Sequence, residues 1–298
     1  MKTCIDAQRG HSGVEPICKV LPMAPSTYYR STAVQADPAL QPRRWHRDAQ
    51  LKTQIQAVWQ ANFQVYGVRK VWHALRNQQI AVARCTVARL MRQLGLRGVI
   101  RGKTVRTTVS DKALPCPQDR VNRQFRAIRP NALWVCDFTF VHTWQGFAYV
   151  AFVIDVFARR IVGWRVAAQA RTDFVLDALE QAIHARCPQG GLTHHSDRGV
   201  EYLSMRYTQR LKEAGIAPSV GSTGDSYDNA LAETINGLYK AEVIHRRAWP
   251  SLKQVELSTL NWVHWYNHQR LLGSIGYRSP AQAEATYDQQ HQGLAAVA

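Results

Sequence analysis

The spacing of hydrophobic residues in the second half of the chain predicts alternating strands and helices. Residues 133–142, 148–156 and 160–167 are rich in β-branched and aromatic side chains between short turns, which is typical of strands. Residues 172–186 repeat apolar side chains at helical spacing, with Thr172 as the expected cap. Further strands are expected at 192–196 and 216–220, and further helices at 202–214 and 230–243. This order predicts an α/β domain with a mixed five-stranded sheet.

The first half of the chain shows helical spacing only. Residues 13–30 predict a short helix, a break and a second short helix that Ser26 caps. Residues 31–46 have no period, and we expect a linker there. Three more helices are expected where apolar residues recur from Leu51, from Val68 and from Thr86. An all-α region therefore precedes the α/β domain.

Charge is concentrated in this helical half. Residues 1–130 hold 23 basic and 6 acidic side chains, whereas residues 131–298 hold 15 of each, and the whole chain carries a formal charge of +17. Residues 49–110 contain 11 Lys and Arg and no acid, which favours contact with a polyanion. The last two helices of this segment are joined by a short connection, which is the outline of a helix-turn-helix.

We therefore expect the basic segment to bind DNA, with Arg84, Arg89 and Arg92 exposed on its last helix. The expected DNA contacts are Arg69, Lys70, Arg84, Arg89, Arg92, Arg101 and Lys103. The alternative is a small helical bundle whose basic face is only solvated.

Composition excludes several other classes of protein. Apolar residues make up 46% of the chain, which is enough for a sizeable core and excludes wholesale disorder. No apolar stretch approaches the roughly 20 residues of a membrane helix, and the amino terminus lacks the apolar run of a secretory signal. The 6 cysteines are scattered without a C-x-x-C pair, which favours free thiols in a reducing cytoplasm over a structural zinc site.

Three carboxylates stand out by their position. Asp137 lies inside an apolar strand, where burying an ionised carboxylate is costly unless something compensates for it. Asp197 follows the fourth strand, at the edge where open α/β sheets carry catalytic groups. Glu233 lies one turn into the helix that follows a loop rich in Gly, Ser and Asp. The intervals are D-x59-D-x35-E, so side chains distant along the chain could converge on one metal cluster.

Oxygen ligands of this kind suit Mg²⁺ or Mn²⁺, and two ions about 4 Å apart would clamp both oxygens of a phosphodiester displacement. The spacing alone leaves another interpretation open, because many different sets of three acidic residues can be chosen from the 15 in this half of the chain. Asp137 could instead be a buried structural aspartate, the role that we expect for Asp155 beside Arg159 and Arg160.

The second half resembles the retroviral-integrase-like core of bacterial insertion-sequence transposases. The resemblance lies in LWVCDFT from Leu133, VIDVFARRIVGW from Val153, HSDRG from His195 and YDNALAET from Tyr227. The best match is the second-reading-frame product of the insertion-sequence three family, and it extends from about residue 13 to the end of the chain. Many relatives carry a histidine soon after the Tyr-Asn pair and the arginine that follows it. This chain has the pair as Tyr266-Asn267 but continues with Arg270-Leu271-Leu272-Gly273, without that histidine.

The resemblance implies an RNase-H-like core in which Asp137, Asp197 and Glu233 are catalytic and hold two ions. It also implies that Lys240, on the same helix face as Glu233, grips the phosphates of the transposon ends; a solvated lysine is the alternative. For His195, a neutral hydrogen-bonded histidine is the simpler expectation. The expected divisions are a helical segment and linker at 1–48, the basic region at 49–110, a linker at 111–130, the core at 131–248 and a helical extension at 249–298.

The function implied is that of a DNA transposase, which binds terminal inverted repeats and performs two-metal-dependent strand cleavage and strand transfer through a circular intermediate. Its expected partners are double-stranded DNA, further copies of the chain and an upstream-frame product of the same element. It is expected to act in the bacterial cytoplasm at the nucleoid, and no membrane partner is expected. Two alternatives remain: a non-catalytic DNA-binding regulator, in which Asp137 would need a cationic partner, and a metal-dependent nuclease without strand transfer.

Overall fold

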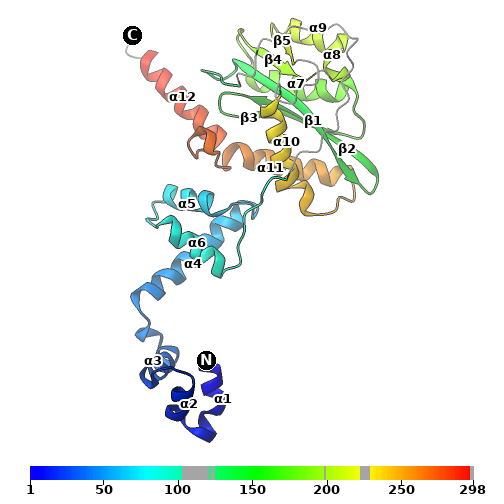
Figure 1. Cartoon of the computed structure of the whole chain (residues 1–298). Helices are drawn as coiled ribbons and strands as arrows, with labels where there is room; N and C mark the ends of the chain where they lie inside the picture. Colours follow the sequence, from blue (N-terminus) through cyan, green and yellow to red (C-terminus); the bar gives the residue numbers. More distant parts are fainter. Residues whose placement is uncertain (103–120, 122–124, 198, 222–228, 296–298) are drawn as a thin grey trace.

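The strands form a mixed sheet at the centre of the second half. The computed structural model describes residues 1–102, 121, 125–197, 199–221 and 229–295, and within them the sheet has five strands in the order β3-β2-β1-β4-β5 (Figure 1). The strands are β1 (Leu133–Thr143), β2 (Gly146–Asp155), β3 (Arg160–Ala167), β4 (Thr193–Ser196) and β5 (Ala217–Val220). The first three strands are antiparallel to one another, whereas β4 and β5 run parallel to β1. This is the RNase-H-like arrangement, as predicted.

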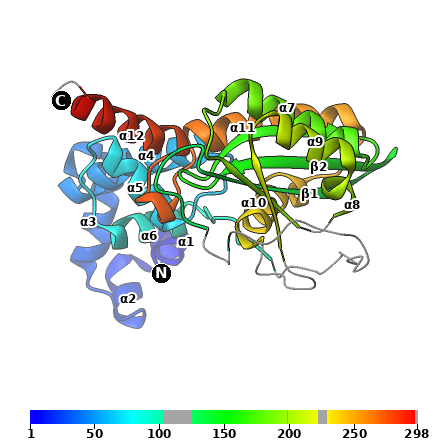
Figure 2. The same cartoon turned by 90° about the horizontal axis from the view of Figure 1, so that it is seen from above.

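Helices cover both faces of the sheet because side chains of β1 alternate between two cores. Trp134 and Cys136 face a core formed with α7 (Thr172–Arg186) and α9 (Met205–Glu213). Val135 faces the other core, which α10 (Ala230–Glu242) and α11 (Leu252–His268) cover (Figure 2). The close packing of α7 requires Gly163, since a Cβ there would lie 2.1 Å from the carbonyl oxygen of Ala178.

The first half is helical, but it differs from the prediction at its start. The helices are α1 (Lys2–Ser12), α2 (Val14–Val20), α3 (Pro25–Ala36), α4 (Arg43–Ala61), α5 (Val68–Asn77) and α6 (Arg84–Gln93), with a 3₁₀ turn, η1 (Pro38–Leu40). The sequence did not predict α1, and the linker expected at 31–46 is wrong because α3 and α4 occupy most of it. Ser26 is not a cap, since α3 begins at Pro25 with Ala24 as its N-cap.

Two further local predictions needed correction. Thr172 does not cap α7, whose N-cap is Arg171 with no side-chain cap. The helix expected at 202–214 is two helices, α8 (Val200–Leu203) and α9, separated at Ser204, whose hydroxyl accepts a hydrogen bond from the amide of Tyr207. Free thiols are confirmed for the five cysteines within the described residues.

The helix-turn-helix region packs onto the α/β core through α11. One continuous hydrophobic cluster joins Leu51 and Ile55 of α4 to Trp262 and Tyr266 of α11. The indole of Trp265 also donates a hydrogen bond to Asn62 Oδ1 at 3.1 Å. The two regions therefore share a core.

A buried ion pair lies under this junction. Arg270, which is 3% exposed, pairs with Glu242 at the end of α10 with an N–O distance of 2.5 Å. The indole of Trp262 also donates a hydrogen bond to the same carboxylate. Tyr66 of the helical region binds the chain on both sides of Arg270, because its hydroxyl accepts from the amide of Leu271 and donates to the carbonyl of Gln269. Arg270 is thus a structural residue of this chain.

The chain leaves the helix-turn-helix region beside the start of α5. Gly98 lies so close to Gly67 that a Cβ on Gly98 would be 2.4 Å from the Gly67 nitrogen. The amide of Val99 also donates a hydrogen bond to the carbonyl of Val65 at 3.0 Å. Only a residue without a side chain allows this contact between the two backbone segments.

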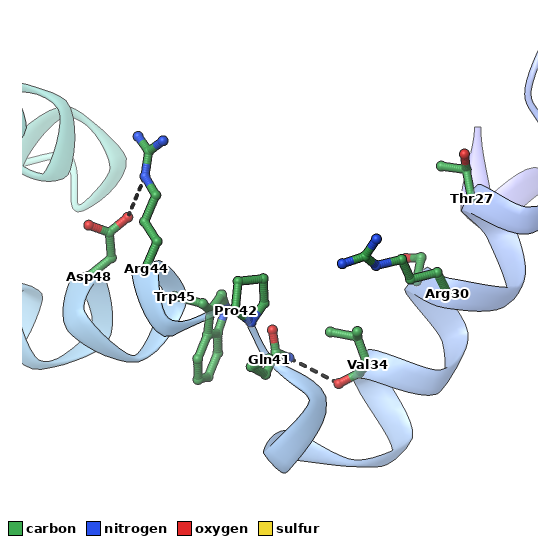
Figure 3. Close-up of a pocket in the computed structure, with 9 residues that line it drawn as sticks. Thr27, Arg30, Val34, Gln41, Pro42, Arg44, Trp45 and Asp48 are labelled. Carbon is green, nitrogen blue, oxygen red and sulfur yellow. Dashed lines mark hydrogen bonds and ion pairs between the residues drawn. The ribbon is translucent and has the colours of Figure 1, made fainter.

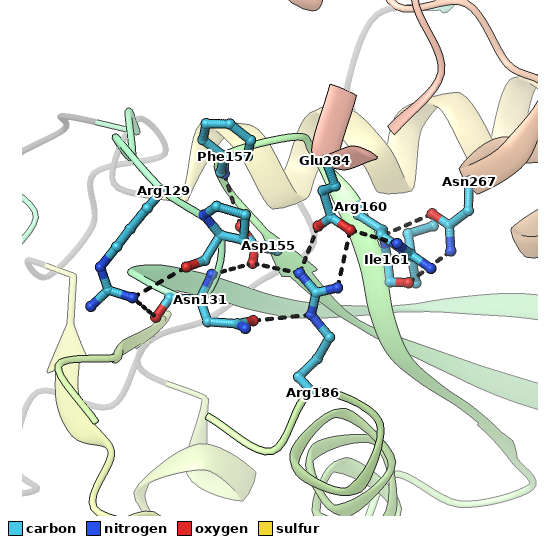
Figure 4. A network of polar contacts seen from close by, with 10 residues as sticks. Arg129, Asn131, Asp155, Phe157, Arg160, Ile161, Arg186, Asn267 and Glu284 are labelled. Carbon is cyan, nitrogen blue, oxygen red and sulfur yellow. Dashed lines mark hydrogen bonds and ion pairs between the residues drawn. The ribbon is translucent and has the colours of Figure 1, made fainter. Parts of the chain in front are cut away.

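The carboxyl-terminal helix is tied to the sheet by a polar network (Figure 4). After η2 (Ile244–Arg246), α11 and η3 (Gly273–Ile275), the chain ends in α12 (Pro280–Ala295). Glu284 of α12 pairs with Arg160 and with Arg186, and Arg186 pairs in turn with Asp155 at 3.4 Å. Asp155 is fully buried and also accepts hydrogen bonds from the amides of Asn131 and Phe157. It is therefore a structural aspartate as predicted, with Arg186 as its partner.

The described helices include none that is both long and apolar enough to cross a membrane.

Replacing Arg270 with Met should lower the free energy of unfolding by about 3–5 kcal/mol, because Glu242 would keep a buried charge without its partner. Urea unfolding followed by circular dichroism measures this change. The matched control is Arg206→Met, which breaks an ion pair whose side chains are 68% and 65% exposed and should cost less than about 1 kcal/mol. Equal losses in the two variants would contradict the role given to the buried pair.

Candidate functional site

The sheet register brings two of the three predicted carboxylates together. In the parallel pairing of β1 with β4, Cys136 lies opposite Ser196. Asp137 is the next residue of β1, and Asp197 is the first residue after β4. Since neighbouring strands lie about 5 Å apart, the two backbones come close together at this edge of the paired segment. The sequence placed each aspartate correctly, but it could not show this register.

The side chain of Asp137 faces α10. Its Oδ2 accepts a hydrogen bond from Nδ2 of Asn236 at 2.9 Å, and its Oδ1 accepts one from the amide of Phe138. Asn229, the N-cap of α10, donates a parallel hydrogen bond to the carbonyl of Cys136 at 2.9 Å. Two asparagines of one helix therefore hold the segment of β1 that carries Asp137.

Neither asparagine was singled out from the sequence. Asn236 lies one turn after Glu233 and one turn before Lys240, so the face of α10 already chosen for those two residues could have indicated it. The Oδ1 atoms of Asn229 and Asn236 are both buried without a hydrogen-bond partner. Buried acceptors of this kind are costly in a folded protein and are often found at functional sites.

Glu233 and Lys240 lie on the same helix as the two asparagines. Both residues are half-buried, and the charge of Glu233 acts on Asp137 together with that of Asp197. The Lys240 ammonium lies 5.1 Å from the centre of the Phe140 ring on β1. Helix α10 thus places an acid and a base beside the strand that carries Asp137.

The electrostatics of the site oppose a second negative charge. Burial and the neighbouring Asp197 raise the pKa of Asp137 well above its usual value, and the hydrogen bond from Asn236 acts against this shift. Burial also raises the pKa of Asp197, although the amide of Gly199 donates a hydrogen bond to its Oδ1. Burial lowers the pKa of Lys240, and the attraction of Asp137 opposes that change.

This donor set fits a divalent cation in its chemistry. The groups are carboxylates and amide carbonyls, which are the ligands that Mg²⁺ and Mn²⁺ prefer. A cation would relieve the repulsion between Asp137 and Asp197, and no lysine or arginine in the described part of the chain forms an ion pair with Asp137. The geometry is incomplete, since no group of three His, Cys, Asp or Glu side chains among the described residues could hold a metal ion as it stands.

The predicted DNA-binding arginines fall into two groups. Arg69, Arg84 and Arg92 are exposed on α5 and α6. Arg89 differs from its prediction, because it is only 34% exposed and pairs with Asp48 of α4 at 2.9 Å. The helix-turn-helix outline is confirmed, with α5 and α6 joined by residues 78–83.

The remaining predicted contacts lie near the core. Lys70 is half-buried, with its ammonium 5.1 Å from the centre of the Tyr66 ring, and burial lowers its pKa to about 8. Arg101 is exposed and crosses α10 at Gly237, where a Cβ would lie 2.8 Å from the arginine Cδ. Arg101 therefore lies over the helix turn between Glu233 and Lys240. Lys103 lies outside the described residues.

The histidines beside Asp197 are structural. His195 is buried with its Nδ1 2.9 Å from the hydroxyl of Ser219, as expected of a hydrogen-bonded histidine. His194 lies 3.0 Å from the hydroxyl of Tyr207, and burial lowers its pKa to about 3, so it is neutral. His194 therefore supplies no positive charge to the carboxylates at neutral pH.

Asp137→Asn should raise the melting temperature in EDTA at pH 7 by about 2–4 °C. Folding raises the pKa of Asp137 above its ordinary value of 3.8. The folded protein therefore loses stability as the pH rises from the pKa of the unfolded state toward the higher pKa of the folded state. The asparagine removes this loss, and Asn236 can turn its free Oδ1 toward the new amide. The gain should therefore disappear near pH 4.

Thermal unfolding between pH 4 and pH 8 measures this difference. Asp173→Asn, at a side chain that is 65% exposed, is the control and should show little change with pH. A difference between wild type and Asp137→Asn that stays constant over this range would refute the electrostatic explanation.

Comparison with known proteins agrees with this architecture. The integrase core domain family matches residues 127–226 and again residues 214–280. The HTH-like domain family matches residues 45–104. Among solved structures, the catalytic core domain of HTLV-2 integrase in complex with magnesium aligns at 15% identity with a TM-score of 0.40, covering 53% of this chain and 99% of that chain.

Curated relatives match over nearly the whole length. The transposase for insertion sequence element IS629 of Shigella sonnei is 59% identical over 287 residues, which is 96% of both chains. The protein of insertion sequence element IS986/IS6110 of Mycobacterium tuberculosis is 54% identical over 282 residues, which is 93% of this chain and 100% of the relative. The chain therefore belongs to the bacterial insertion-sequence transposases, a family with an HTH-like domain and an integrase core domain that acts in DNA transposition.

Proposed function

We propose that this transposase binds the terminal inverted repeats of its element and catalyses metal-dependent cleavage and transfer of DNA strands. The observation that carries the proposal is the position of Asp137 on β1 beside Asp197, which directly follows the parallel strand β4, with the charge of Glu233 of α10 acting on Asp137. Residues 49–110 would hold the DNA, and residues 131–248 would carry out the chemistry.

Asp137, Asp197 and Glu233 would hold two Mg²⁺ or Mn²⁺ ions, which would supply Lewis acidity and positive charge at the reacting phosphate. Asn236 would keep the Asp137 carboxylate oriented, since its hydrogen bond favours the ionised form. Glu233, one turn into α10, would complete the ligand set on the same side of the sheet.

Positive side chains would guide the DNA backbone across α10. Arg101 crosses α10 at Gly237, and Lys240 lies three residues farther along the same helix. Both can bind phosphate oxygens without competing for the carboxylates, because they approach from the helix rather than from β1. Exposed arginines of α5 and α6 would hold the same duplex farther from the reacting phosphate.

The active form would be an oligomer on DNA, because two transposon ends must be joined in one complex. An upstream-frame product of the same element would be a further partner. The protein would work where the chromosome lies, in the bacterial cytoplasm at the nucleoid.

Asp137→Asn, Asp197→Asn and Glu233→Gln should each reduce strand transfer in Mg²⁺ by more than about 100-fold, because losing even an outer-shell partner of a metal site costs up to about that much. The assay follows joining of a labelled repeat end to target DNA. Asp177→Asn, at an exposed carboxylate that pairs with Arg165, is the matched control and should retain activity.

The same assay separates the alternatives. Cleaved ends without joined products would identify a nuclease. DNA binding with no reaction in wild type would identify a regulator. A triad variant that transfers strands at the control rate would remove its residue from the site.

Arg84→Gln and Arg92→Gln should each reduce the slope of log affinity against log salt concentration by about 1, because each exposed guanidinium releases about one counterion from DNA. Arg89→Gln is the matched control on the same helix, since Asp48 already neutralises this arginine. Its slope should change less. Fluorescence anisotropy with a repeat-end duplex measures the three slopes, and equal slopes for all three would contradict this assignment of the contacts.

A further inference from the structure

The first 36 residues form a helical module with a core of its own. Ile5 of α1, Cys18 of α2 and Tyr28 of α3 are each at most 1% exposed and form a cluster separate from the two large cores. The HTH-like family match covers residues 45–104, so this module lies outside it. A separate core indicates that the module has a task distinct from supporting α4.

The module has the geometry of a helix-turn-helix. Helix α2 is followed by a four-residue turn, residues 21–24, and then by the 12-residue helix α3. Two backbone hydrogen bonds close the turn, from Leu21 to Ile17 and from Met23 to Cys18. Helix α1 packs on α2 as the third helix of the unit. In such units the second helix of the pair enters the major groove with its amino-terminal residues at the base edges.

One buried side chain fixes the rotation of α3. The hydroxyl of Tyr28 donates a hydrogen bond to Asp6 at 2.7 Å and accepts one from Arg9 at 3.4 Å. Tyr28 is the buried residue of this helix. Residues on the opposite side of its first turns, which are Ser26, Thr27, Tyr29 and Arg30, are all exposed.

The exposed face has the chemistry that DNA requires. Residues 16–36 contain no acid. Hydroxyl groups and a guanidinium at this position can bind base edges in the major groove, with arginine favouring guanine. Tyr29, which is 53% exposed, can rest on the sugar-phosphate backbone beside the groove.

A cleft between α3 and α4 extends this face (Figure 3). The cleft has a volume of about 620 Å³, and its lining includes Thr27 and Arg30 from α3 with Arg44 and Trp45 from α4. Asp48 also lines it, but two arginines neutralise its carboxylate, Arg89 at 2.9 Å and Arg44 at 4.0 Å. The cleft therefore presents positive charge next to the exposed side of α3.

We propose that residues 1–36 are a second DNA-reading unit, in which α3 enters the major groove and Arg44 binds a phosphate across the cleft. The inference rests on the proposed binding of terminal repeats. Helix α4 links the two units, because its Asp48 lines the cleft to α3 and pairs with Arg89 of α6. The base pairs read by α3 would therefore lie next to those read by α6. The terminal repeat thus carries two recognised blocks.

Hydroxyl-radical footprinting of the full-length protein on a duplex with the terminal repeat of its element tests this proposal. Wild type should protect two blocks. Thr27→Ala/Arg30→Ala should lose one block while keeping the other, with affinity about 10-fold lower. The matched control is Arg206→Ala, an exposed arginine of α9, which should keep both blocks.

A second variant preserves the charge and the fold. Arg30→Lys should keep affinity for a scrambled duplex but lose about 10-fold of the preference for the repeat, because lysine cannot make the bidentate contact. An unchanged footprint and unchanged preference in both variants would overturn the second reading unit and leave the proposed function intact. Absence of any repeat-specific protection by wild type would overturn both. Unchanged protection with loss of transposition would show that α3 binds a protein, which also overturns the proposal.

Discussion

The buried pair between Glu242 and Arg270 is the interaction on which the arrangement of this transposase depends. It joins the end of the helix that carries Glu233 to the segment that follows α11, inside the low-dielectric core where a lone charge would be costly. Tyr66 binds the backbone on both sides of Arg270. The same few atoms therefore fix the helix that carries Glu233 and hold the HTH-like region against it.

The distribution of charge follows from this arrangement. Acidic side chains in the first half are few, and Asp48 there is neutralised by arginines. In the core, most buried acids have cationic partners, as Asp155 has in Arg186 and Glu242 has in Arg270. Among the residues that the structure describes, the partners of Asp137 are hydrogen-bond donors, and none is a cation in an ion pair. A divalent ion would stabilise such a buried carboxylate more than one that already has a cationic partner. The positive charge of the ion would also reduce the repulsion between the carboxylate and the phosphates of DNA.

The sequence predicted most of the strands and helices because their periodicity is local. It failed at α1, where Ile5 is the buried residue and no apolar repeat marks the helix. Caps were also misplaced, since Ser26 and Thr172 both lie just inside their helices. The local pattern of apolar residues thus predicted where most helices and strands lie, but it did not predict the residues at which the helices begin.

The sequence predicted the candidate residues of the site but not their contacts. Asp137, Asp197 and Glu233 could be chosen from their places at strand and helix ends and from the family resemblance, but strand register and side-chain partners depend on contacts distant in sequence. Asp155 finds Arg186 rather than the neighbouring arginines, and Arg89 turns to Asp48. Asn236 reaches Asp137 across 99 positions, which no single-sequence pattern encodes.

The contact between Gly67 and Gly98 has a consequence for the reaction. It fixes the point at which the chain leaves the HTH-like domain, and Arg101 contacts α10 only three residues later, a reach of at most about 10 Å. The HTH-like domain therefore stays within this short distance of the helix that carries Glu233. If this domain reads the terminal repeat and the carboxylates carry out cleavage, as proposed, the fold sets the distance between the recognised sequence and the broken bond, and an inserted base pair would move the position of the cut.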